Sequence, residues 1–425
     1  FMPLVLLRLY SFAWWLMLPL VLGRLWWRGR QEPGYRAHIA ERLGFALPLF
    51  SGPVMMVHAV SVGETRAAEP LILALLDAYP DHQILLTHMT PTGRATGSAL
   101  FGHQPRVRQA YLPYDTLWMT RRFLAQCRPS LCVLMETEVW PSLIASCARA
   151  VVPVALVNAR LSERSLRRAR RFDTLLGQAA RQITLVAAQT QDDAARLQSL
   201  GATSLIVTGS LKFDITPPAA MLAAGAALRA QIGPRPVLLC ASTREGEEAL
   251  LLSAFKQHKS AYPADVLLMI VPRHPQRFDQ VARLIDGQGW SMMRRSQLAQ
   301  AALPVTTQVL LGDSMGELFA YYAACDLAFI GGSLLPLGGQ NLIEACSCGK
   351  PVLLGPHTFN FAQSSDDAVQ LGAACRIEDA AQLIVQAGKL LQSTEALARM
   401  GRAALHFATK EQGATRRIVA ALLTL

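Results

Sequence analysis

The chain has 425 residues, of which 52% are hydrophobic and only 17% are charged. This composition excludes a disordered protein, and the length predicts about two or three domains. Lysine and arginine number 41 against 30 acidic residues, a formal net charge of +11 that favours an anionic partner such as phosphate, lipid head groups or nucleic acid. The eight cysteines are scattered, which indicates reduced core thiols and argues against a zinc site.

The first segment, residues 1–30, contains the one stretch that could cross a bilayer. From Met2 to Trp27 it is long enough for a single span, tryptophans mark its ends, and no cleavage site follows. Arginines follow on its C-terminal side, which predicts a membrane anchor with the rest of the chain in the cytoplasm. Two alternatives stay open: a buried helix, and a helix lying in the membrane interface, which Arg8 favours.

After this segment, short aliphatic runs alternate with helical patterns, as in parallel sheets covered on both faces. In the first half the expected strands are Val54–Ala59, Ile84–His88, Val107–Tyr111, Leu131–Met135, Val152–Asn158, Thr184–Ala188 and Leu205–Thr208. A proline- and alanine-rich stretch, Thr216–Pro236, is interpreted as a linker with a short helix. In the second half the expected strands are Val237–Ala241, Val266–Val271, Gln308–Leu311, Leu327–Ile330 and Val352–Leu354.

This pattern predicts an α/β protein with two doubly wound, Rossmann-like domains facing a cleft. Ligands of such sheets bind beyond the carboxyl ends of the strands, so the loops that follow strands are the places to look for chemistry. The expected segments are the anchor at 1–30, a domain at 31–215, a second domain at 216–411, and a helix at 412–425 that packs back on the first domain.

The loops after these strands carry a series of motifs that resembles the Kdo (3-deoxy-D-manno-octulosonic acid) transferases. The resemblance covers essentially the whole chain, and the order of the motifs carries more weight than any one of them. The first half has HAVSVGE (58–64), TPTG (90–93), YLPYD (111–115), METEVWP (135–141), NARLS (158–162) and GSLKFD (209–214). The second half has PRHPQRF (272–278), GDSMGEL (312–318), FIGGSL (329–334), GGQNLIEA (338–345) and GPHTFNF (355–361).

The resemblance implies a GT-B fold, with an acceptor-binding first domain and a donor-binding second domain. It implies CMP-Kdo as donor, the tetraacylated disaccharide precursor of lipid A as acceptor, inversion at the sugar, and a place at the inner membrane in lipopolysaccharide assembly. No cofactor or metal is expected, since the sequence has no DxD motif and no pair of histidines at metal spacing. One departure is visible: Gln340 stands where the family is expected to have histidine, so no role is given to that position.

Inverting transfer requires a base that takes the proton from the acceptor hydroxyl, and Glu64 is the candidate. Glu64 follows the first strand near the start of a helix, where the helix dipole favours a carboxylate; the alternative is a helix-capping role. Glu136 and Glu138 follow the strand Leu131–Met135, and the resemblance implies that Glu136 and Lys212 stabilise the transition state. A structural ion pair between the two loops is the alternative.

Donor binding is expected in the second half, where glycine-rich loops and a helix start suit a phosphate. Arg273 can bind phosphate oxygens through two nitrogens, and Gly316 allows close approach of the backbone to a base or ribose. The helix after Gly338 and Gly339 is expected to begin near Asn341. The candidate CMP-binding residues are Pro272, Arg273, His274, Met315, Gly316, Glu317, Asn341, Leu342, Ile343 and Glu344.

A run of arginines predicts contact with the anionic acceptor or with the membrane surface. The weaker acceptor candidates are Ser61, Gly63, Arg160, Arg164, Arg167 and Arg168. Phe172 is the one aromatic residue near this run, so nucleic acid is not expected as a partner. The rival interpretations are another GT-B transferase that uses a UDP-sugar, and a membrane-anchored nucleotide-binding protein without catalysis. Release of CMP or of UDP would distinguish the two enzymes.

Overall fold

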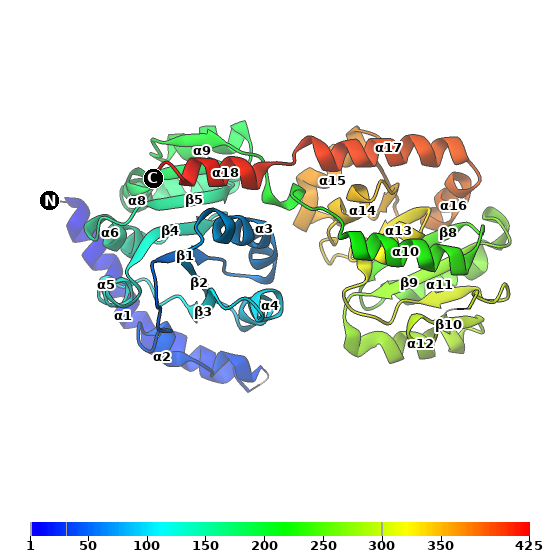
Figure 1. The fold of residues 1–425 in the computed structure, drawn as a ribbon, viewed down its shortest axis with the longest axis horizontal. Helices are drawn as coiled ribbons and strands as arrows, with labels where there is room; N and C mark the ends of the chain where they lie inside the picture. The colour runs from blue at the N-terminus through cyan, green and yellow to red at the C-terminus, as the bar shows by residue number, and fades with distance from the viewer. Residues whose placement is uncertain (1, 31, 299–300) are drawn as a thin grey trace. The chain divides into compact units, whose positions relative to one another are not determined.

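The computed structural model describes residues 2–30, 32–298 and 301–425, and the chain divides into two compact units. The first unit comprises Phe1–Asp214 together with Gln412–Leu425, and the second comprises Ile215–Glu411. Phe1 and Gln31, with which two of the expected segments begin, lie outside the described residues. Each unit is built around one parallel seven-stranded sheet (Figure 1). The expected pair of doubly wound α/β sheets is thereby confirmed.

The sheet of the first unit has the strand order β3-β2-β1-β4-β5-β6-β7, with all neighbouring strands parallel. Its central strands β1 and β5 are buried along their whole length and β4 from Leu131 to Met135, which explains their continuous apolar sequences. The strands are β1 Val54–His58, β2 Gln83–His88, β3 Val107–Tyr111, β4 Pro129–Met135, β5 Val154–Ala159, β6 Leu185–Ala188 and β7 Leu205–Val207.

Helices cover both faces of this sheet (Figure 1). The C-terminal helix α18 packs beside α3, and its residues join the same buried cluster as α3 and strands β1, β2 and β4. The helices are α1 Met2–Arg28, α2 Ile39–Arg42, α3 Val62–Ala78, α4 Pro91–Phe101, α5 Leu117–Cys127, α6 Pro141–Arg149, α7 Glu163–Ala169, α8 Asp173–Gln182, α9 Gln191–Ser199 and α18 Ala414–Leu422, with short 3-10 turns at Arg170–Phe172 (η2) and Leu211–Phe213 (η3).

The second unit repeats the plan with the strand order β10-β11-β9-β8-β12-β13-β14. Its strands are β8 Val237–Thr243, β9 Leu267–Pro272, β10 Met292–Arg294, β11 Val309–Leu311, β12 Leu327–Ile330, β13 Val352–Leu354 and β14 Ala374–Arg376. Its helices are α10 Ala219–Ile232, α11 Glu247–Gln257, α12 Phe278–Gly287, α13 Leu318–Ala324, α14 Ile343–Ser347, α15 Ala362–Gln370, α16 Ala380–Leu391 and α17 Thr394–Lys410.

The stretch interpreted as a linker with a short helix is mostly helix, so that interpretation is corrected. Helix α10 has 14 residues and is rich in alanine, the strongest helix former. It packs against α13, where Gly225 is so close to Ala320 and Ala323 that a side chain at this position would collide with them. Only its flanks, with Pro217, Pro218, Pro234 and Pro236, are irregular.

Helix α1 has 27 residues, and the segment Val5–Arg28 is long and apolar enough to cross a membrane. Only 11% of its most apolar window is buried in the protein. Buried Leu18 packs with Tyr114 and Met119 of the first unit, and the partly buried Trp14, Val21, Leu22 and Leu25 join the same cluster. The helix therefore lies along the first unit with most of its apolar surface uncovered (Figure 1).

Candidate active site

The order of the first sheet changes direction between β1 and β4, and the loops that follow these two strands flank that point. This is the position where open parallel sheets bind their ligands. The β1 loop leads into α3 and carries Glu64, and the β4 loop leads into α6 and carries Glu136 and Glu138. Two motifs that lie far apart in the sequence thus provide one group of carboxylates.

Glu64 is held at the first turn of α3 by short local hydrogen bonds. The backbone N–H of Val60 donates to Oε2 over 2.8 Å, and the hydroxyl of Ser61 donates to Oε1 over 3.2 Å. Ser61 is also the N-cap of α3 and accepts the Glu64 N–H, as in a capping arrangement. The capping role considered from the sequence is therefore present, and it fixes the carboxylate while leaving it partly exposed.

Glu136 connects the β4 loop to two cations. It is buried and has a left-handed backbone with φ of 55°, a conformation that costs free energy in a non-glycine residue. Its carboxylate accepts a hydrogen bond from Nε of Arg160 over 3.0 Å and lies 3.8 Å from Nζ of Lys212. The loops after β4, β5 and β7 meet at this ion cluster.

Glu138 completes the group, although the residue pattern alone gave it no role. The indole N–H of Trp140 donates to its Oε2 over 2.8 Å, and Nε2 of His58 lies 3.8 Å from the same oxygen. Burial, followed by the negative charge of Glu64, raises the pKa of Glu138 to about 7. Burial lowers the pKa of His58 to about 3, so this imidazole is neutral and the contact is not an ion pair.

The electrostatics of the group are set by burial and by mutual repulsion. Burial is the main cause that raises the pKa of Glu64, with a further contribution from the carboxylate of Glu136. A carboxylate with a raised pKa is a stronger base, which suits proton abstraction. Burial also lowers the pKa of Lys212, and the nearby Arg160 adds to that effect, while Glu136 opposes it.

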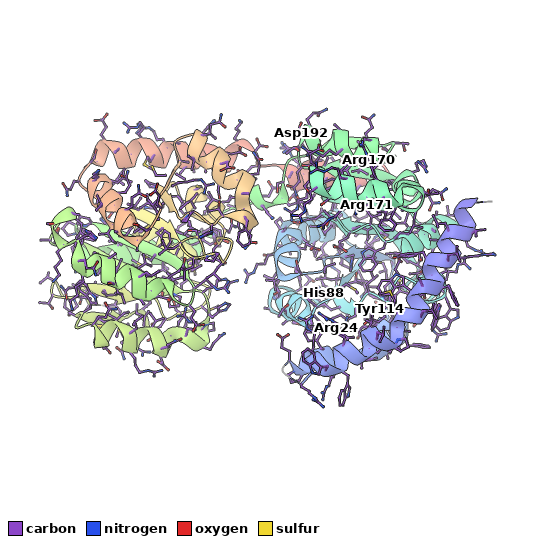
Figure 2. The ribbon with its side chains drawn as sticks, turned by 180° about the vertical axis from the view of Figure 1, so that it is seen from behind. Arg24, His88, Tyr114, Arg170, Arg171 and Asp192 are labelled. Atoms are coloured by element: carbon purple, nitrogen blue, oxygen red, sulfur yellow. The ribbon has the colours of Figure 1, made fainter. Side chains whose placement is uncertain are left out.

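The weaker acceptor candidates divide into two groups. Ser61 and Gly63 lie in the first turn around Glu64, and Arg160 belongs to the ion cluster through Glu136. Arg164, Arg167 and Arg168 are exposed on α7, outside this cluster. Arg170 and Arg171 continue this basic surface through η2, and Figure 2 labels both on the first unit.

In the second unit, the loops after β9 and β12 meet across the strand β8 that lies between them. Arg273 follows β9 and donates through Nε to the side-chain oxygen of Gln340, which follows β12, over 3.3 Å. Pro272 is the last residue of β9, and His274 comes after Arg273. Burial and the charges of neighbouring arginines lower the pKa of His274, so the positive charge here belongs to the guanidinium groups.

The loop after β11 contributes Met315, Gly316 and Glu317. Gly316 has φ of 79°, and no atom lies within 4 Å of where a side chain would begin, so this backbone is open to a ligand. Met315 is 59% exposed, and Glu317 pairs with Arg295 over 3.1 Å. Because β11 pairs with β9, this loop and the Arg273 loop lie at the same edge of the sheet.

The helix expected to begin near Asn341 is present as α14. Helix α14 has five residues and starts at Ile343, whose N–H is taken by the side-chain oxygen of Asn341 over 3.0 Å. Leu342 and Ile343 are buried core residues, and Glu344 lies 3.4 Å from the amide of Asn341. The adjacent Gly338 and Gly339 marked the turn correctly, but the sequence did not reveal that Asn341 occupies the first helical N–H.

Glu247 is a buried residue of this loop region that sequence reasoning missed. Its carboxylate accepts hydrogen bonds from the N–H groups of Gly332 over 2.7 Å, Leu334 over 3.0 Å and Arg244 over 2.8 Å. It thereby fixes the start of the glycine-rich loop to helix α11. Two glutamates in the first turn of a helix after a buried strand were the available signal, but helix capping explains such a pair equally well.

In the part of the chain that the structure describes, no group of three or more His, Cys, Asp or Glu side chains is arranged to hold a metal ion. The charged atoms at both candidate sites belong to carboxylate, guanidinium and ammonium groups. Arginine and lysine can neutralise a phosphate that leaves during group transfer.

Comparison with known proteins decides the family. The family described as 3-deoxy-D-manno-octulosonic-acid transferase (kdotransferase) matches residues 37–215. A 3-deoxy-D-manno-octulosonic acid transferase of Bordetella pertussis is 45% identical over 97% of this chain and 98% of its own. The chain belongs to the Kdo transferase family.

A second Kdo transferase, from Haemophilus influenzae, is 37% identical over 94% of both chains. Members of the Kdo transferase family are glycosyltransferases, so the chain is an enzyme of that class. A UDP-GlcNAc 2-epimerase from Neisseria meningitidis has a similar structure, with a TM-score of 0.57, 17% identity, and coverage of 88% of this chain and 100% of its own. That likeness concerns the two-domain GT-B-like fold alone.

Proposed function

We propose that this Kdo transferase moves Kdo from CMP-Kdo to the acylated disaccharide precursor of lipid A, at the cytoplasmic face of the inner membrane. The grouping of Glu64 with Glu136, Arg160 and Lys212 at the switch point of the first sheet carries the proposal. It combines a base with cations, and the reaction needs both because a proton must be removed while an anionic sugar is transferred.

In this mechanism the acceptor hydroxyl attacks the anomeric carbon of Kdo as the bond to the CMP phosphate breaks. Glu64 takes the hydroxyl proton, and CMP leaves with both electrons of the broken bond. Lys212 faces the Kdo carboxylate, and Glu136 keeps this lysine in place. Arg273 and the open backbone at Gly316 hold the nucleotide. No metal or other cofactor takes part in this proposal.

The substitution Glu64→Gln tests the catalytic assignment. We expect turnover to fall by about 100-fold or more, because the amide cannot accept the proton, while CMP still protects the second unit against thermal unfolding. The assay incubates the full chain with CMP-Kdo and the tetraacylated acceptor and detects the product by mass spectrometry.

The control is Glu69→Gln, which removes a carboxylate from the same helix α3 at a position away from the cluster. This variant should retain wild-type turnover. Wild-type turnover in Glu64→Gln would refute the assignment of the base. A wild-type enzyme that releases UDP from a UDP-sugar, and no CMP from CMP-Kdo, would refute the donor.

A further inference from the structure

Helix α1 is divided lengthwise into a face held by the first unit and a face left uncovered. The buried and half-buried side chains recur every three or four residues, at Leu6, Leu7, Tyr10, Ser11, Trp14, Leu18, Val21, Leu22 and Leu25. The uncovered face carries large apolar residues, at Val5, Leu9, Phe12, Trp15, Leu16, Met17, Leu20, Trp26 and Trp27.

Specific polar contacts hold the inner face. The hydroxyl of Tyr10 donates to Asp115 over 3.0 Å, and the hydroxyl of Ser11 accepts the N–H of Leu117 at the start of α5 over 2.9 Å. The Trp14 ring stacks on Tyr114 with a centroid distance of 5.7 Å, and Figure 2 shows Tyr114 beside α1. These contacts would be lost if α1 left the unit to cross a membrane.

While α1 is docked on the first unit, the part of the helix outside the contacts is too short to span a membrane. Contacts from Tyr10 to Leu25 occupy about 24 Å of helix at 1.5 Å per residue. The residues before Tyr10, of which Leu6 and Leu7 are themselves half-buried, add at most about 12 Å, whereas a hydrocarbon core is about 30 Å thick. A docked α1 therefore has too little free length to cross.

The uncovered face continues onto the first unit as a surface of aromatic rings and arginines. Trp15 contacts Trp118 with a centroid distance of 6.1 Å, Trp118 contacts Phe45, and the Arg122 guanidinium lies 4.3 Å from the Phe45 ring. Farther along α1, Arg36 lies 4.5 Å from the Trp26 ring. Aromatic side chains next to arginines suit the boundary between anionic head groups and acyl chains.

We propose that α1 is an in-plane membrane helix: it stays docked on the first unit and inserts its uncovered apolar face into the surface of an anionic bilayer. Arg8, on the exposed side, then reaches the head groups and does not have to lie within the hydrocarbon core. The partner is a lipid surface, because apolar residues, interfacial tryptophans and arginines occur together on one face.

This placement also ties the membrane to the carboxylate loop, a point that rests on the proposed function. Asp115, which Tyr10 contacts, accepts the N–H groups of Ser142 and Leu143 in the first turn of α6. Helix α6 begins directly after the loop that carries Glu136 and Glu138. The site for a lipid acceptor is thus braced against the helix that meets the lipid.

Depth measurements along α1 test the proposal. Single cysteines are introduced into the full chain at Leu9, Leu16 and Leu20, labelled with bimane, and bound to phosphatidylglycerol vesicles that contain brominated lipids. An in-plane helix predicts equal quenching at all positions, strongest with bromine near the head groups. Deep quenching at Leu16 with shallow quenching at the other positions would overturn it. Labelled wild type gives the background, since its cysteines are buried or half-buried.

Flotation with the same vesicles tests the uncovered face. The double substitution Leu16→Asp and Leu20→Asp should lower the vesicle-bound fraction about tenfold or more, whereas Leu405→Asp on α17 should leave it unchanged. Unchanged binding of the double variant would refute the proposal, as would a vesicle-independent dimer that this variant abolishes. The double variant should still turn over acceptor that is dispersed in detergent. Glu64→Gln should bind vesicles normally but lose turnover. A failure of the membrane proposal can therefore be told apart from a failure of the proposed function.

Discussion

Three carboxylates, those of Glu64, Glu136 and Glu138, lie together at the switch point of the first sheet, and the charges of Glu64 and Glu136 add to the burial that raises the pKa of Glu138. Glu136 is matched by Arg160 and Lys212, whereas Glu138 faces an indole and a neutral imidazole. Glu138 therefore carries a proton during part of the neutral pH range, because burial raises its pKa to about 7. Identical residue types acquire different roles because their neighbours differ.

The raised pKa of Glu138 makes stability depend on pH. The folded protein holds this proton more tightly than the unfolded chain, where the pKa is 4.5, so the stabilisation is complete below about pH 4.5 and disappears as the pH rises to about 7. The effect is on the order of 1–3 kcal/mol. We expect wild type to lose thermal stability relative to Glu138→Gln over this range, as measured by unfolding midpoints.

The control for this comparison is Glu163→Gln, which removes an exposed glutamate from the same unit. Its unfolding midpoint should follow that of wild type across the pH range. Parallel pH profiles for wild type and Glu138→Gln would show that the folded protein does not perturb this carboxyl group.

Single residues show where sequence reasoning reached its limit. The position of Glu64 after β1 was predictable, because a carboxylate after the first strand of such a sheet falls at the switch point. Arg160 was assigned to the acceptor surface, yet it pairs with Glu136, a contact between residues 24 positions apart in the sequence. Its partner cannot be read from local spacing, nor can the N–H groups of Gly332 and Leu334 that Glu247 binds, since these contacts depend on tertiary packing.

At the scale of elements, buried strands were predicted well, and so was the three-residue edge strand β7, but two edge strands of the second sheet were not. The continuous apolar runs identified β1 and β4 within two residues, because full burial leaves a clear signal. Strands β10 and β14 were missed: each has three residues and closes one edge of the second sheet, where β10 is half-buried and β14 is partly exposed. Such segments lack both the length and the hydrophobicity that mark a strand.

The glycine-rich loop after β12 depends on Glu247. Replacing Glu247 with glutamine turns one acceptor oxygen into a donor that faces N–H groups, which costs about 1–3 kcal/mol. We expect a lower unfolding midpoint and weaker CMP binding by calorimetry. Glu245→Gln, an exposed change between β8 and α11, is the control and should alter neither. Normal CMP affinity in a folded Glu247→Gln protein would show that the glycine-rich loop does not take part in donor binding.

At the scale of the whole molecule, the chain passes between the units twice, near residues 214 and 411. Asp214, at the first passage, accepts the N–H groups of Gly413 and Thr415 just after the second, and so caps helix α18. Arg417 of α18 adds a hydrogen bond to the carbonyl of Thr208 over 2.8 Å. The two connecting segments are therefore joined to each other on the first unit.

Substituting Asp214 with alanine should lower the stability of the first unit by about 1–3 kcal/mol, because two backbone N–H groups lose their charged acceptor. Differential scanning calorimetry with CMP present, which holds the second unit, would report the change. Asp192→Ala, an exposed aspartate labelled in Figure 2, provides the control and should have little effect. Equal midpoints for both variants would mean that this cap is dispensable.

The position of α18 has a consequence for biosynthesis. Ile418 and Leu422 complete the core beside α3, yet a ribosome makes them only after it has translated the entire second unit. The part of the protein translated first is therefore the part finished last, unlike a chain whose domains mature in order. Throughout that interval the apolar surface of α3 stays uncovered in the nascent chain, and a chaperone could hold it until α18 is made.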